Sequence, residues 1–156
     1  MNDYVIYNTQ NHILICRQHG YGIAPDYITR HFRECHKEIP LKTRNEISEY
    51  AKTLELWMSE DVITRHDGLF IEGLKVIAGY QCQYEGCHEL RSSEISMKKH
   101  CHKIHHWVMT QGYKWKKQLM QTIFHGQHVK YVLFRLKLII DISLLIRTMN
   151  IRMCNG

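Results

Sequence analysis

The sequence of 156 residues contains no apolar run long enough to cross a bilayer. The nearest candidate, residues 133–146, is short and carries Arg135, Lys137 and Asp141. The first residues, Met-Asn-Asp-Tyr-Val, show no basic flank followed by an apolar core, so a secretory signal is not expected. We therefore expect an intracellular protein without a membrane partner.

Patterns that carry common catalytic chemistry are also missing. No paired carboxylates, phosphate-binding loop or nucleophile–base arrangement accompanies the main Cys/His cluster. A metal-dependent nuclease would have to use the spare histidines His102, His105 or His106. Catalytic zinc needs an open coordination position, whereas four good ligands predict a closed structural site. We expect no enzyme, no catalytic residue and no small-molecule substrate.

What the sequence does contain is a Cys/His pattern between residues 80 and 106. Its members follow the spacing Cys-x4-Cys-x12-His-x4-His: Cys82, Cys87, His100 and His105. This spacing fits a two-Cys, two-His zinc finger. A strand–turn–strand knuckle with Gly86 in its turn would bring the thiolates together, and a helix would present both imidazoles on one face. We predict one Zn²⁺ at these four residues.

Neighbouring residues support this finger. Tyr80 and Met97 stand where such fingers place their core side chains, and Ser92 or Ser93 can cap the helix. The ligand set stays open at two places: His106 could replace His105, and Cys101 could replace His100. The competing interpretation is an accidental cysteine pair in a histidine-rich segment.

A second, divergent pattern lies near the N-terminus. After a predicted β-hairpin come four candidate ligands with Cys-x2-His-x11-His-x4-His spacing: Cys16, His19, His31 and His36. They resemble a zinc finger whose second cysteine has become histidine, and Cys35 is an alternative fourth ligand. We predict a second zinc here, although a hairpin and helix held by apolar contacts alone would give the same pattern.

The fold expected from these parts is α+β but mainly helical, with two separated small ββα zinc-finger units joined by a helix and no extended sheet. The divergent unit covers residues 1–38, an amphipathic helix 39–60, a linker 61–79 and the CCHH finger 80–106. A basic-aromatic helical segment would cover 107–130, and an apolar tail, truncated or divergent, 131–156.

Charge is distributed unevenly along the chain. Residues 1–80 carry nine Lys and Arg against eleven Asp and Glu, a balance of −2, whereas residues 81–156 carry twelve against four, a balance of +8. The second half should therefore be attracted to polyanions. Lysines alternate with Trp107, Tyr113 and Trp115, a mixture that suits phosphates and bases.

We therefore predict a DNA-binding or other nucleic-acid-binding zinc module in the nucleus, with weak sequence specificity. The candidate contact residues are Ser93, Ser96, Lys98, Lys99, Lys103, Lys114, Lys116 and Lys117. Two alternatives remain. One is that the lysines form only a solvated surface beside buried tryptophans. The other is that the fingers bind a protein partner through surfaces around Trp57 or Trp107.

The order of motifs resembles a fungal family, the orsellinic acid biosynthesis cluster protein D family. The shared motifs are Leu14-Ile-Cys16-Arg-Gln-His19, Ile39-Pro-Leu-Lys-Thr-Arg44, Gly79-Tyr-Gln-Cys82, Trp107 and Gln121-Thr-Ile-Phe124. The resemblance covers roughly residues 10–131 and fades after Tyr131. It implies a paired zinc-finger region rather than an activity, and similar regions stand at the front of longer fungal proteins.

Overall fold

Strands from both halves of the chain pair in one mixed sheet. The structure, a computed structural model, describes residues 3–65, 67–126 and 129–135. The strands are β1 (Val5–Asn8), β2 (Ile13–Cys16), β3 (Tyr21–Ile23), β4 (Val76–Cys82), β5 (Leu90–Arg91), β6 (Trp115–Phe124) and β7 (Lys130–Val132). The helices are α1 (Ile28–Cys35), α2 (Leu41–Lys52), α3 (Ser59–Arg65) and α4 (Glu94–His105), with short 3-10 turns η1 (Pro25–Tyr27) and η2 (Met109–Gln111).

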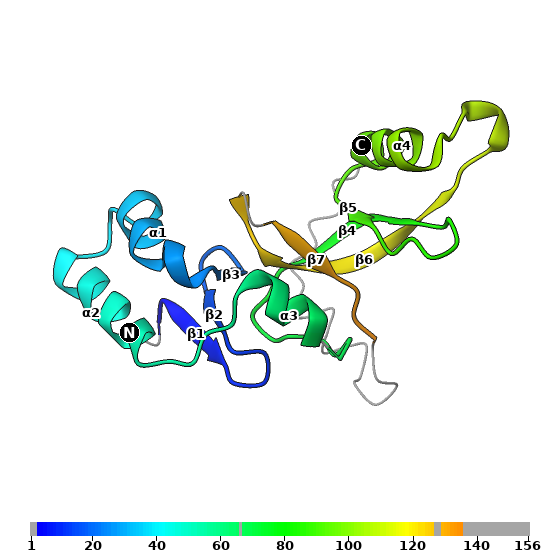
Figure 1. The fold of residues 1–156 in the computed structure, drawn as a ribbon. Helices are drawn as coiled ribbons and strands as arrows, with labels where there is room; N and C mark the ends of the chain where they lie inside the picture. Colours follow the sequence, from blue (N-terminus) through cyan, green and yellow to red (C-terminus); the bar gives the residue numbers. More distant parts are fainter. Residues whose placement is uncertain (1–2, 66, 127–128, 136–156) are drawn as a thin grey trace, which may run out of the picture.

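The sheet order is β1-β2-β3-β6-β4-β5. Strand β7 lies outside this sequence of neighbours and pairs with β6. β1, β2 and β3 form an antiparallel meander, and β4 pairs antiparallel with β6 from Val76↔Gln121 to Cys82↔Trp115. A single parallel pair, Gly22↔Phe124, connects the two parts. In Figure 1 the N-terminal strands and α1–α2 lie at one end, and α4 lies over β4 and β5 at the other.

The junction between the two parts depends on a glycine and a buried glutamine. A Cβ atom on Gly22 would lie 2.7 Å from the Ile123 carbonyl oxygen, so only glycine permits this approach of the backbones. Gln121 is fully buried. Its amide accepts a hydrogen bond from the Ile71 backbone N–H at 2.8 Å and donates to the carbonyl of the same residue at 2.7 Å. The loop before β4 is thereby fixed to β6.

Three apolar clusters fill the structure. Both faces of β2 are buried, because alternate side chains point to opposite sides of a strand. Leu14 and Cys16 pack into a first cluster with Phe32 and other residues of α1 and α2. Residues 13 and 15 pack into a second cluster, which is shared with α3, β6 and β7. The third cluster lies under α4 and contains Cys82, Met97, Cys101, Trp107 and Trp115.

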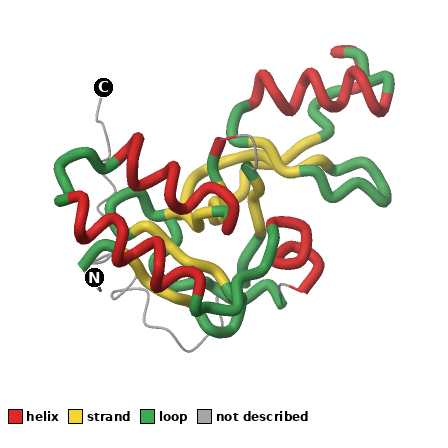
Figure 2. The backbone as a smooth tube through the Cα atoms, turned by 60° about the vertical axis from the view of Figure 1, so that its left-hand side comes forward, coloured by secondary structure: helices red, strands yellow, loops and turns green. Residues whose placement is uncertain are grey.

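The expected fold class, mainly helical with no extended sheet, is wrong. The structure contains a seven-stranded sheet beside its helices, and the two Cys/His units are connected by strand pairing instead of being separate. The tube drawing in Figure 2 shows strands lying between α1 and α2 on one side and α4 on the other. The prediction failed because it considered each unit alone, whereas strand pairing over long sequence separations is not visible in local patterns.

Two segments account for most of this error. Residues 107–130, expected to be helical, contain β6, whose Met120–Phe124 part is buried throughout. Residues 61–79, expected to be a linker, contribute most of α3 and the start of β4. Of the predicted apolar tail, residues 136–156 lie outside the described residues. Among the described residues, no helix is long and apolar enough to span a membrane.

Candidate metal centres

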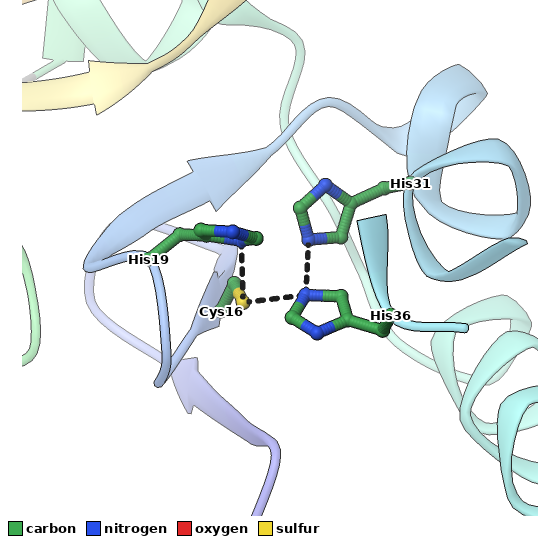
Figure 3. Close-up of side chains that lie close together, drawn as sticks. All are labelled: Cys16, His19, His31 and His36. Atoms are coloured by element: carbon green, nitrogen blue, oxygen red, sulfur yellow. Dashed lines mark hydrogen bonds between the residues drawn. The ribbon is translucent and has the colours of Figure 1, made fainter. Parts of the chain in front are cut away.

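The first Cys/His group forms where β2, the following turn and α1 meet. Cys16 ends β2, His19 stands in the turn before β3, His31 lies in α1, and His36 is the C-cap of that helix. Their ligand atoms all lie within 4.8 Å of one another. Figure 3 shows the four side chains converging on one point. The sequence prediction thus named residues that the fold does bring together.

The distances in this group match those of a tetrahedral zinc site. The Cys16 Sγ atom lies 3.4 Å from His19 Nδ1 and 3.3 Å from His36 Nε2, and the Nε2 atoms of His36 and His31 are 3.1 Å apart. With Zn–S near 2.3 Å and Zn–N near 2.0–2.1 Å, tetrahedral geometry places S and N about 3.6 Å apart and two N atoms about 3.3 Å apart. The group could therefore hold a metal ion such as zinc.

One histidine of this group has a carboxylate behind it. The Nδ1 atom of His36 lies 3.2 Å from Glu38 Oε1, while its Nε2 faces the other ligands. Such a carboxylate fixes the ring orientation and strengthens the nitrogen as a ligand. His31 differs, because its buried Nδ1 has no hydrogen-bond partner. The sequence prediction did not include Glu38, although its position two residues after a ligand was a usable signal.

The second group forms between β4, the 83–89 turn and α4. Its ligand atoms, from Cys82, Cys87, His100 and His105, also lie within 4.8 Å of one another. The distances are 3.6 Å from Cys82 Sγ to His105 Nε2 and 3.3 Å from Cys87 Sγ to His100 Nε2. Gly86 has φ +71° in the turn, as expected for the knuckle. This group, too, could hold a metal ion such as zinc.

The structure also shows where the alternative ligands lie. His106 caps α4 in the left-handed conformation at φ 52° and is absent from the group. Cys35 is exposed and lies outside the first group. Cys101 is buried with its sulfur 4.0 Å from that of Cys82, although it does not belong to the four-residue group. The arrangement therefore favours His105 over His106 and His36 over Cys35 as ligands.

Burial biases the protonation of these side chains in opposite ways. It is the main cause that raises the pKa of Cys16, Cys82 and Cys87. It is also the main cause that lowers the pKa of His19 and His100, and it lowers that of His31 to about 4. The imidazoles of His19, His31 and His100 are thus biased toward the neutral form, which binds metal, whereas the thiols must lose protons when a metal binds.

Each group has a tyrosine ring stacked on one of its histidine ligands. Tyr21 stacks on His19 with ring centroids 5.2 Å apart, and Tyr84 stacks on His105 at 4.1 Å. His125, the residue that follows β6, stacks on Tyr21 with ring centroids 4.9 Å apart. No pattern in the sequence connects residue 125 with the first group, because the connection depends on the pairing of β3 with β6.

The predicted nucleic-acid contacts fall into two sets. Ser93 is the N-cap of α4, since its Oγ accepts a hydrogen bond from the Ser96 N–H at 3.2 Å. Both serines thus stabilise the start of the helix. Lys98 pairs with Glu94 at 3.4 Å. The remaining predicted lysines are exposed: Lys99, Lys103, Lys114, Lys116 and Lys117.

The interleaved tryptophans do not form a binding surface. Trp107 and Trp115 pack against each other beneath α4, with exposed fractions of 7% and 8%. The competing interpretation, that the tryptophans are buried against the finger, is the one the structure supports. Tyr113 is the exception, with an exposed fraction of 75%.

A family model matches the part of the chain that contains both Cys/His groups. The family model described as "Orsellinic acid/F9775 biosynthesis cluster protein D" matches residues 3–106, a range that contains both groups. The chain belongs to this family. The matched range ends before β6 and β7, although these strands complete the sheet.

One relative carries the same name, Orsellinic acid/F9775 biosynthesis cluster protein D, and comes from Emericella nidulans (strain FGSC A4 / ATCC 38163 / CBS 112.46 / NRRL 194 / M139). It is 29% identical over 126 residues, which cover 80% of this chain and 24% of the relative. This chain therefore corresponds to about a quarter of that protein. No solved structure matches the chain.

Proposed function

We propose that this chain is a non-catalytic module, stabilised by two zinc ions, that binds nucleic acid through the phosphate backbone. The observation that carries the proposal is the outward face of α4. Lys99, His102 and Lys103 are exposed and recur at helical spacing on the side away from the buried Met97 and Cys101, and Lys98 flanks them. The helix thus has one face for metal and core, and another that is cationic.

The charge on this face and on β6 is largely unneutralised. In the part of the chain that the structure describes, no carboxylate forms an ion pair with the exposed lysines, which are Lys99, Lys103, Lys114, Lys116 and Lys117. Exposed unpaired lysines suit phosphate contacts, because they release counterions from the nucleic acid when they bind. Short serines at the helix start read bases poorly, so we expect weak sequence preference.

A structural role for zinc supports a binding module rather than an enzyme. Each group supplies four Cys or His donors, and four protein ligands leave no coordination position for substrate. When bound, zinc would connect strand, turn and helix in each unit. We propose the nucleus as the setting of this module, and the greater length of the relative supports a module that acts as part of a larger protein.

The test is a titration of duplex DNA at about 50 and about 200 mM salt, with a charge-reversed helix as the variant. Lys99→Glu/Lys103→Glu should weaken binding by about tenfold or more and reduce the salt slope by about 1.8, for two lost phosphate contacts. The control is Lys42→Glu, an exposed lysine on α2 at the other end of the molecule. Zinc content should remain the same in all three proteins. Salt-independent binding, or equal losses in variant and control, would contradict the proposal.

A second candidate, a protein-interaction module, rests on a rigid apolar loop after α4. Val108, Met109 and Tyr113 are 49%, 80% and 75% exposed. The loop is held by a 2.7 Å hydrogen bond from Trp107 Nε1 to the Gly112 carbonyl. Exposed apolar side chains that gather on one loop are typical of partner binding. It ranks second because the adjoining face of α4 is cationic instead of neutral.

The two candidates separate in a paired experiment. The variant Met109→Ser/Tyr113→Ser should keep duplex binding if the lysines bind nucleic acid, and should lose proteins captured from a fungal extract if the loop binds a partner. An unchanged set of captured proteins would count against the interaction candidate.

A further inference from the structure

The second Cys/His group has a fifth donor beside it. Cys101 is fully buried, and its Sγ atom lies 4.0 Å from the Sγ atom of Cys82, itself only 2% exposed. Cys82 in turn belongs to the group that contains Cys87. Three thiols from β4, the turn and α4 therefore gather at one end of the finger, although the four-residue group uses only two of them.

The separation between two of these sulfurs is the one expected for thiolates that share a metal ion. With a metal–sulfur bond of about 2.3 Å, two sulfurs on one ion lie about 3.8 Å apart in tetrahedral geometry and about 4.0 Å apart in trigonal geometry. A third thiol therefore stands beside a ligand sulfur, where as a thiolate it could take the place of imidazole ligands. The side chain starts from a buried position and would not have to leave solvent.

A buried cysteine often acts only as a small apolar side chain. Cys35 allows a comparison with Cys101 in this respect. Cys101 follows ligand His100, just as Cys35 precedes ligand His36. Cys35 is exposed and lies outside the first group. Adjacency in sequence alone therefore does not bring a thiol to a site. Cys101 belongs to the apolar cluster under α4 together with Met97, Trp107 and Trp115, but its sulfur also faces a ligand sulfur.

We propose that the second site binds two classes of metal in two ways: Zn²⁺ through Cys82, Cys87, His100 and His105, and monovalent copper through the thiolates of Cys82, Cys87 and Cys101. The proposal rests on the zinc sites of the proposed function. Soft thiolate ligands favour Cu⁺, whereas mixed Cys and His ligands suit Zn²⁺. In the exchange copper enters and remains as Cu⁺, Zn²⁺ leaves, and the Cys101 thiol releases its proton to solvent.

The experiment adds buffered Cu⁺ to the zinc-loaded chain without oxygen. Every protein carries Cys154→Ser, because that residue lies outside the described residues and its thiol could also bind copper. Released zinc is measured with a chromogenic indicator, bound copper by metal analysis, and copper–thiolate bonds by their charge-transfer absorption. The variants are Cys101→Ser and Cys101→Ala, and Cys35→Ser is the matched control.

The parent and the Cys35→Ser control should take up one Cu⁺ and release one of two zinc ions. Both Cys101 variants should retain two zinc ions and need at least about tenfold more free Cu⁺ for the same release. Equal copper requirements in all proteins would overturn the proposal. So would zinc loss from the Cys101 variants before copper is added, or copper-dependent zinc release from Cys82→Ser. A parent chain without zinc would instead contradict the proposed function itself.

Discussion

The two Cys/His groups differ in how much of the surrounding structure exists without a metal. The first is built into the nine-residue cluster that α1 and α2 complete, and Cys16, His31 and His36 are at most 1% exposed. The second lies over five buried residues, two of which are cysteines, and its other three ligands are half-buried. The same kind of ligand set thus stands on a substantial core in one unit and on a small one in the other.

This difference indicates that metal contributes unequally to folding. Small units that cannot bury enough apolar surface need a metal or disulfide to fold. The second unit fits that description, whereas apolar packing already positions most of the first. We expect zinc to be required for the fold of the second unit and to refine that of the first.

The largest effect should come from removing a thiolate of the second site. Structural zinc contributes about 10–16 kcal/mol of apparent folding free energy in isolated fingers, more than a five-residue cluster can replace. Cys82→Ser should therefore lose one zinc and unfold α4, with hydrogen exchange of its amides as the measurement. Cys35→Ser is the control. Protected α4 amides in zinc-free Cys82→Ser would remove the proposed contrast between the units.

The equivalent change in the first site should be milder. Cys16→Ser should lose its zinc, yet α1 should remain protected because Phe32 and Ile28 are buried against β2 and α2. Far-UV circular dichroism and hydrogen exchange of α1 amides would measure this. If α1 unfolds as completely as α4 does in Cys82→Ser, the first unit depends on metal as much as the second.

A smaller effect should follow from the carboxylate behind His36. Glu38→Gln keeps the size of the side chain but weakens the acceptor for the His36 ring N–H, so zinc affinity at the first site should fall by about 10–100-fold. The second site should not change, since no described carboxylate hydrogen-bonds His100 or His105. Competition with a chromogenic chelator would measure both affinities. Equal losses at both sites would show that the effect is not local.

The last effect is confined to the metal-free first unit, whose stability should depend on pH. Burial, and then His36, His19 and His125, lower the pKa of His31 from 6.5 to about 4. Because the folded state holds this ring neutral, its contribution to stability is complete above about pH 6.5 and declines as pH falls toward 4. Denaturant unfolding of metal-free protein across this range should show the decline, and His31→Gln should flatten it. Parallel curves for the two proteins would assign the dependence to other groups.

Ligand spacing made both sites predictable, because finger geometry is local: a knuckle, a turn and one helix supply every donor. The cap at Ser93 was predictable for the same reason. In contrast, the pattern of lysines and aromatics in β6 predicts a helix, because by itself it resembles an exposed helix surface. Its identity depends on β4, β7 and β3, whose contacts span up to about a hundred residues of sequence.

Gln121 is a second feature that local sequence patterns do not predict, because it is a polar residue that is buried. A glutamine among apolar residues gives no sign of burial, yet its amide satisfies backbone groups of the loop at Ile71 and Leu74. A buried polar side chain is acceptable only where partners are provided, and here they lie about fifty residues away. Sequence patterns could name the ligands but not the framework that holds the two sites together.

The approach of Gly22 to Ile123 has a consequence for multivalent binding. Fingers joined by flexible linkers can adjust their separation as they follow a groove. Here a shared sheet and the second apolar cluster hold the two ends at a fixed separation. A partner that engages both ends therefore gains avidity only if its own contact points match that span, and a mismatched partner gains none.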